Sequence, residues 1–277
     1  ITLVCVKQCD IFFDKSQAIN HNYYVENQQE KQRILITIEY DGTSFCGWQS
    51  QNGKRCVQST LESALSVFYG EKIEIHGSGR TDAGVHAFGQ TAHFDAPIKN
   101  NFKVEKLPYA INEKLPEDVK ILYAKIVPND FHARKSVKQK TYQYKAYFSH
   151  FESPLERCRM MRVFPEPNLK AMQEAANLLL GEHDFSAFMS TGSSIKDTTR
   201  TIYSIAIKKN QNDYTFEICG NGFLYNMVRI IVGTLIEIGQ NRLSVTNIQK
   251  ALATGERKYA GRTAQPQGLY LKSVKYE

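Results

Sequence analysis

Residues 77–90 read GSGRTDAGVHAFGQ and are the most informative stretch of this 277-residue chain. Its four glycines allow positive φ angles and let a ligand approach the backbone closely. Short strands are expected on either side of it, over residues 72–76 and 91–94. The stretch therefore predicts a loop between strands that presents Arg80 and Asp82 among small neighbours.

Asp82 has two interpretations from this pattern. An aspartate in a glycine-rich loop often hydrogen-bonds only its own turn. Alternatively, the loop presents the carboxylate beside a guanidinium, as an active site would. A phosphate-binding loop is disfavoured, because the third glycine of G-x-G-x-x-G is replaced by Asp82 and no G-x-x-x-x-G-K-[ST] occurs.

Outward from the loop, the chain shows the same kind of order twice, with strands followed by a helix and further strands. Ser59 and Glu62 are typical of a capping box, and Asn168 of a helix N-cap. Strands are expected over 33–40, 119–127, 141–148, 201–208, 214–219 and 269–276. Helices are expected over 104–111 and 223–238, after Ser59 up to Gly70, from Asn168 to Gly181, and in a short segment that ends at Gly255. This order favours an α+β fold in which two similar α/β halves with mainly antiparallel sheets meet at a central cleft.

The chain divides into three parts at the sequence level. Residues 1–32 are rich in asparagine and glutamine without clear periodicity, and we expect a mobile or non-native extension. Residues 33–134 form an N-terminal α+β domain that carries the glycine-rich loop. Residues 135–277 form a C-terminal α+β domain.

Composition restricts the class of protein. Hydrophobic residues make up 42% and charged residues 23%, as in a globular protein, and the net charge of +7 suits a polyanionic partner or a solvated basic surface. The apolar run around residues 230–238 is shorter than the roughly 20 residues that cross a bilayer. Six cysteines without a C-x-x-C pair predict free thiols in a reducing compartment, so we expect a cytoplasmic protein without a membrane partner.

Three other features could carry chemistry. Asp82, His86 and His93 are conceivable metal ligands, but their spacing matches no metal motif and ordinary histidines are favoured. The aromatic and cationic residues over 138–147 could stack a base and hold phosphates, or simply form a tyrosine-rich strand. Arg229 lies in an apolar segment, where a buried guanidinium needs an anion.

Six sequence blocks, in order, are similar to the TruA family of tRNA pseudouridine synthases. They are Tyr40-Asp41-Gly42-Thr43 with Gly47-Trp48-Gln49; residues 79–87, GRTDAGVHA; Phe131-His132-Ala133-Arg134 with Tyr142 and Tyr144; Phe185-Ser186-Ala187-Phe188; residues 220–229, GNGFLYNMVR; and residues 260–264, AGRTA, with Gln267-Gly268-Leu269-Tyr270. The resemblance covers residue 33 to the C-terminus. Lys140 and Thr141 differ from the arginines that are common there.

The resemblance implies the pseudouridine synthase fold, with RNA bound in the central cleft, and an isomerase that converts uridine to pseudouridine at positions 38, 39 and 40 of tRNA. Asp82 would be the catalytic carboxylate, either as a nucleophile or as a base that forms a glycal. Arg229 would be its partner, Arg80 would help to extrude the nucleotide, Tyr142 would stack on the uracil, and Leu269 would pack on the base.

The family also implies partners and cofactors. The reaction is redox-neutral and needs no group donor, so no cofactor, nucleotide or metal is expected. A homodimer is implied, with each anticodon arm contacting both subunits. The alternatives are a non-catalytic RNA-binding protein on the same fold and a nucleotide-dependent enzyme that uses the glycine-rich loop.

Overall fold

The computed structural model describes residues 30–98, 102–192 and 195–277. Its strands are β1 (Lys31–Tyr40), β2 (His76–Gly77), β3 (His86–Pro97), β4 (Val119–Val127), β5 (Gln139–Phe148), β6 (Met161–Val163), β7 (Gly181–Asp184), β8 (Thr199–Asn210), β9 (Asp213–Gly220) and β10 (Leu269–Lys275). Its α-helices are α2 (Val57–Tyr69), α3 (Leu107–Asn112), α4 (Leu169–Asn177), α5 (Met227–Gly239) and α6 (Thr246–Thr254).

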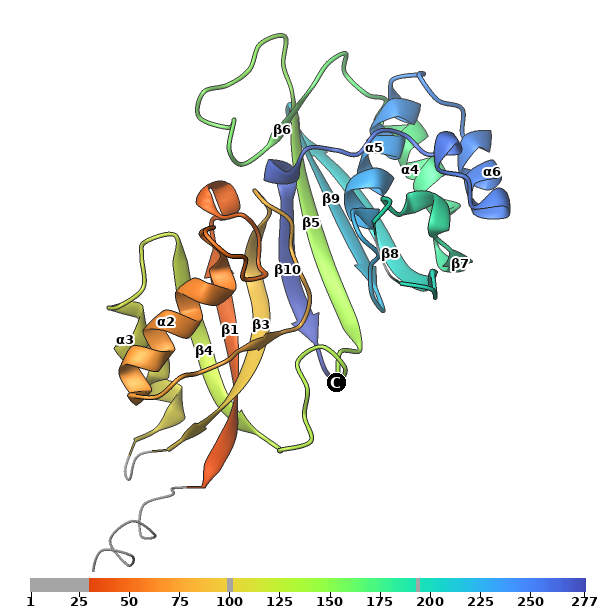
Figure 1. The fold of residues 1–277 in the computed structure, drawn as a ribbon. Coiled ribbons are helices and arrows are strands. Elements are labelled where there is room, and N and C mark those ends of the chain that lie inside the picture. Colours follow the sequence, from red (N-terminus) through yellow and green to blue (C-terminus); the bar gives the residue numbers. More distant parts are fainter. Residues whose placement is uncertain (1–29, 99–101, 193–194) are drawn as a thin grey trace, which may run out of the picture.

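One sheet runs through the described residues in the order β4-β1-β3-β10-β5-β9-β8-β7, with β2 beside β3 and β6 beside β5. The pairs are antiparallel except β10 with β3 and β5 with β6. Figure 1 shows α2 and α3 at the β1–β4 end of the sheet, and α4, α5 and α6 at the β8–β9 end. The expected α+β class with mainly antiparallel pairing is confirmed.

The C-terminal strand β10 joins the two ends of the sheet. It pairs with β3 through Tyr270 and His86, and with β5 through Leu269 and Tyr144. A strand from the very end of the chain thus lies between a strand of each half (Figure 1). The division at residues 134 and 135 falls in the connection between β4 and β5 and stays a prediction.

Alternating residues explain why the strands have a buried face. Ile34, Ile36 and Ile38 of β1 are fully buried, and Tyr144 and Ala146 of β5 are buried in the same way. Successive side chains of a strand point to opposite faces, so each strand contributes one row to the core. These rows belong to one hydrophobic cluster that spans both ends of the sheet.

Two local predictions in the first half are wrong. Helix α2 begins at Val57, so Ser59 lies inside it, and Glu62 accepts hydrogen bonds from the backbone N–H of Ile75 and from Gln58 instead of closing a capping box. The expected strand over residues 72–76 is limited to β2, because the chain there is tied to α2 through Glu62. The stop at Gly70 is confirmed by its left-handed φ of 75°.

In the second half, the Asn168 cap is confirmed, since its side chain accepts a hydrogen bond from Ala171 N–H. Helix α4 ends at Asn177, before the expected Gly181, which starts β7. Helix α5 begins at Met227, later than residue 223, because Asn226 has a left-handed φ of 61° that interrupts the helix. Of the expected extension over 1–32, residues 1–29 lie outside the described residues, and Lys31 already belongs to β1.

Candidate active site

The loop between β2 and β3, residues 78–85, is held against the segment that follows β1. Trp48 N–H donates to the carbonyl of Thr81 at 3.0 Å, and the hydroxyls of Tyr40 and Thr81 share a buried hydrogen bond of 2.8 Å. A Cβ on Gly42 would lie 2.0 Å from the Val85 carbonyl oxygen, so only glycine permits this approach. The loop that carries Asp82 is therefore fixed rather than merely connecting two strands.

Asp82 forms an ion pair with Arg229 across 147 positions of sequence. Arg229 Nη1 donates to Asp82 Oδ2 at 3.0 Å, with exposed side-chain fractions of 14% for Arg229 and 30% for Asp82. The carboxylate is therefore anchored on one side and still reachable on the other. Asp82 does not simply close its own turn, and the anion that Arg229 needs is present.

Helix α5 and the chain before β10 position the guanidinium. Arg229 Nη1 also donates to Asn226 Oδ1 at 2.7 Å, and Nε donates to the carbonyl of Ala264 at 2.8 Å. The left-handed residue Asn226 places its amide oxygen at the start of α5, three positions before Arg229. Sequence reasoning did not assign Asn226 or Ala264 this role, because nothing local links residue 264 to residue 229.

Tyr142 lies on β5 with 8% of its surface exposed, and its ring meets Phe223 edge-to-face at a centroid distance of 5.2 Å. Burial raises the pKa of its phenol, and the nearby Tyr40 and Asp82 raise it further. The hydroxyl thus stays protonated at neutral pH. Asp82 is thus a near neighbour of Tyr142, close enough for its charge to act on the phenol.

Leu269 is buried at the start of β10, opposite Tyr144 of β5, two pairs away from the Leu271–Tyr142 pair. Arg80, in contrast, is exposed, and its Nε donates to Gln49 Oε1 at 3.2 Å. The structure therefore brings Asp82, Arg229 and Tyr142 together, with Leu269 on the adjoining strand. Arg80 donates its hydrogen bond to Gln49. The guanidinium beside Asp82 therefore belongs to Arg229.

The conceivable metal ligands are engaged elsewhere. His86 accepts a hydrogen bond from Gly42 N–H at 3.0 Å and also contacts the Cys158 carbonyl, while His93 accepts from Ala133 N–H at 3.1 Å. Among residues 30–98, 102–192 and 195–277, no group of three or more His, Cys, Asp or Glu side chains is arranged to hold a metal ion. In those same ranges, the cysteines Cys46, Cys56, Cys158 and Cys219 are free thiols.

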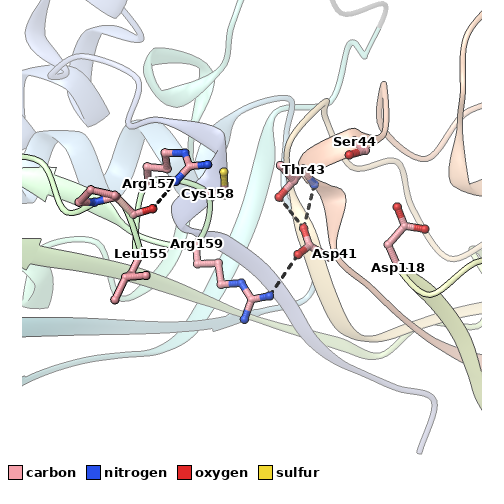
Figure 2. A pocket seen from close by; sticks show the side chains of 9 residues that line it. Asp41, Thr43, Ser44, Asp118, Leu155, Arg157, Cys158 and Arg159 are labelled. Carbon is pink, nitrogen blue, oxygen red and sulfur yellow. Dashed lines mark hydrogen bonds and ion pairs between the residues drawn. The ribbon is translucent and has the colours of Figure 1, made fainter.

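A cavity of about 360 Å³ is lined by residues that include Asp41, Asp118 and Arg159 (Figure 2), and Asp82 is not among its lining residues. Asp41 accepts from Thr43 on one side of it and pairs with Arg159 at 3.5 Å on the other. None of the five predicted site residues lines this cavity. In the described part of the chain, no helix is both long and apolar enough to cross a membrane.

Comparison with known proteins identifies the family of this chain. A family model described as tRNA pseudouridine synthase matches residues 36–134 and 175–277. A tRNA pseudouridine synthase A of Ruminiclostridium cellulolyticum is 46% identical over 247 residues, which cover 88% of this chain and 99% of that protein. The enzyme of the same name from Acetivibrio thermocellus is 46% identical over 244 residues, again 88% and 99%.

A solved archaeal box H/ACA sRNP Nop10-Cbf5 complex aligns at 11% identity with a TM-score of 0.35, covering 87% of this chain and 47% of that chain. That value is too low to support a conclusion. The family match and the two relatives do support one, because they extend over both halves. The family model and both relatives carry the name tRNA pseudouridine synthase, so the class is an isomerase that acts on tRNA uridine. The chain belongs to the tRNA pseudouridine synthase family.

Proposed function

We propose that this protein isomerises uridine to pseudouridine at positions 38, 39 and 40 of the tRNA anticodon arm, with Asp82 as the catalytic residue. The observation that carries the proposal is the Asp82–Arg229 ion pair of 3.0 Å in a loop fixed by Tyr40, Gly42 and Trp48. Family membership supports the reaction, and the geometry supports the assignment of Asp82.

The reaction breaks the N1–C1′ bond of uridine and forms a C5–C1′ bond. The proton on C5 leaves, N1 gains a proton, and nothing is oxidised or reduced. Asp82 either attacks the nucleotide or removes a proton from the sugar, and in both routes it acts as an anion. Arg229 holds the carboxylate of Asp82 in place through the hydrogen bond from Nη1 at 3.0 Å.

The other predicted site residues would hold the uracil, take part in proton transfer or contact the RNA. Tyr142 presents a phenol that stays protonated beside Asp82, so it can donate a proton and stack on the uracil. Leu269 forms an apolar wall on β10. Arg80, exposed on the same loop as Asp82, is placed to contact the RNA when the target nucleotide leaves its stack.

The proposal includes the assembly and location of the enzyme. A homodimer in which each tRNA contacts both subunits and lies in the central cleft suits the net charge of +7. Free thiols suit the cytoplasm. Sedimentation equilibrium of the free protein measures the oligomeric state, and a monomer at micromolar concentration contradicts the proposed homodimer.

Tritium release tests the function directly. Transcripts of tRNA with 5-tritiated uridine are incubated with the wild type, Asp82→Asn and the exposed control Asp130→Asn. We expect release by the wild type and by Asp130→Asn, and none by Asp82→Asn, whose tRNA affinity stays unchanged because its shape is nearly constant. Sequencing of the product then locates the modified positions.

The outcomes separate the proposal from its rival. Tight tRNA binding without release by the folded wild type would favour a non-catalytic RNA-binding protein. Release by Asp82→Asn at the wild-type rate would remove Asp82 from the reaction. Release from positions outside 38–40 would keep the chemistry and change the substrate site.

A further inference from the structure

Lys140 lies on β5, two residues before Tyr142, and so on the same face of the strand. Its ammonium donates a hydrogen bond to the carbonyl oxygen of Ser78 at 2.8 Å. The same Nζ lies 2.7 Å from the place where a Cβ on Gly79 would stand. The ammonium thus packs against the backbone of Ser78 and Gly79, which form the entrance of the loop that carries Asp82.

The loop entrance is also bonded on its other side. Ser78 N–H donates to the Thr91 carbonyl at 2.8 Å, and the buried Ser78 hydroxyl donates to Gln90 Oε1 at 2.6 Å. Gln90 Nε2 in turn donates to the Gly79 carbonyl at 3.0 Å. Residues 78 and 79 are therefore held between β3 and Lys140, three positions before Asp82.

Across the sheet, the described residues give this ammonium no counter-charge. Its partners across the sheet, Gly220 of β9 and Val274 of β10, have no titratable side chains. The loop offers only a carbonyl, and the charged neighbour is the cation Arg134. In the described residues, no carboxylate forms an ion pair with Lys140.

Burial lowers the pKa of Lys140 to about 8, and Arg134 contributes in the same direction. An ammonium in such a place costs stability unless it makes a specific contact. A charged donor also binds a carbonyl about twice as strongly as a neutral one. The bond to Ser78 is therefore strongest while Lys140 is charged.

We propose that Lys140 is a positioning residue for Asp82, which fixes the entrance of the catalytic loop to β5 through its ammonium. It does not touch the reacting atoms. This side chain joins the strand that carries Tyr142 to the loop that carries Asp82. The inference rests on the proposed function, because its readout is the rate at which Asp82 acts.

The test compares Lys140→Met, Lys140→Arg and the exposed β8 control Lys208→Met with the wild type. Single-turnover tritium release gives the rate constant from pH 6 to 9.5, a filter assay gives the affinity for tRNA, and thermal unfolding gives stability. We expect Lys140→Met to lower the rate at pH 7 at least tenfold with less than a threefold change in affinity. Lys208→Met should behave as the wild type.

The pH profile separates positioning from a structural role. The wild-type rate should fall as the pH rises through about 8, where Lys140 loses its proton. Lys140→Arg keeps its charge, and its profile should stay flat in this range, as should that of the slower Lys140→Met. Burial raises the pKa of Tyr142 and lowers that of His86, so neither group accounts for a decline near pH 8.

Two results would overturn the inference: a Lys140→Met rate equal to that of the wild type, or the same alkaline decline in the wild type and in Lys140→Met. If the variants do not fold, a flat wild-type profile between pH 7 and 9.5 has the same meaning. Absence of release by the wild type would instead remove the proposed function itself. If the wild type is active and Asp82→Asn is inactive, the proposed function stands whatever the rates of the Lys140 variants are.

Discussion

Arg229 uses its guanidinium for three contacts, with Asp82, Asn226 and the carbonyl of Ala264. A planar fork of donors can satisfy several acceptors at fixed angles, which the single ammonium of a lysine cannot do in the same place. At 14% exposure, little water is available to replace these bonds. The residue therefore serves both the orientation of Asp82 and the packing of the chain before β10.

Arg229→Leu should lower the rate of tritium release at least 10²-fold, because Asp82 loses the donor that orients it. It should also lower the thermal midpoint, since three acceptors lose their donor. Combining it with Asp82→Asn should cost no more activity than Asp82→Asn alone, because residues that act as a unit are not additive. The exposed Arg242→Leu is the control, and a wild-type rate for Arg229→Leu would contradict the assignment.

At the scale of elements, helix α5 and residues 260–264 form one unit. Gly261 N–H donates to the Thr234 hydroxyl at 2.8 Å, and Ala264 N–H donates to the Arg229 carbonyl at 3.0 Å. A Cβ on Gly233 would lie 1.8 Å from the Arg262 carbonyl oxygen. The helix therefore needs a glycine in its middle to let this segment approach and bring Ala264 to Arg229.

Gly233→Ala should lower both the thermal midpoint and the rate, the latter at least tenfold, because the added methyl displaces the segment that holds Arg229. In an open helix the same change would stabilise by about 1 kcal/mol, so the expected sign is opposite to helix propensity. Gly222→Ala is the control, since its Cβ would meet only ordinary contacts of 3.6 Å with Arg200. A higher thermal midpoint for Gly233→Ala would show that residues 260–264 shift without destabilising the fold.

At the scale of the whole molecule, three histidines gather where β2, β3 and the connection from β4 to β5 meet. The ring centroids of His76 and His93 lie 5.1 Å apart, and those of His93 and His132 lie 4.9 Å apart. Burial, and then the nearby Arg33, His76 and His132, lower the pKa of His93 to about 4. The surroundings of His93 therefore favour its neutral imidazole.

The free energy of unfolding should fall as the pH is lowered from 6.5 towards 4. In this window the unfolded His93, with its ordinary pKa of 6.5, binds a proton that the folded protein excludes. The loss for this one group is at most about 1.4 kcal/mol per pH unit. Urea unfolding at pH 7, 6 and 5 measures it.

His93→Gln should show a weaker loss over that range than the wild type, because glutamine does not titrate. The exposed His150→Gln should keep the wild-type slope and so corrects for carboxylates that titrate nearby. An equal slope in His93→Gln and the wild type would mean that the cluster does not control acid stability.

Local rules explain what could be predicted. The alternation of Ile34, Ile36 and Ile38, the stop at Gly70 and the cap at Asn168 depend on neighbours in sequence, and the structure confirms them. The errors at Glu62 and at the start of α5 arise where a contact from elsewhere overrides local preference. Glu62 bonds Ile75 N–H, and Asn226 takes a left-handed conformation to hold Arg229.

The order of the motifs determined the family and the α+β class without any coordinates, because each motif is a continuous stretch whose residue types are visible. The resemblance implied that Arg229 is the partner of Asp82, and the tertiary structure brings the two together over 147 positions. Only the tertiary structure decided that Lys140 meets Ser78 over 62 positions. It also decided that β10 lies between β3 and β5. The physical reason is range: periodicity and capping act over a few residues, whereas these contacts exist only after distant strands have packed into one sheet.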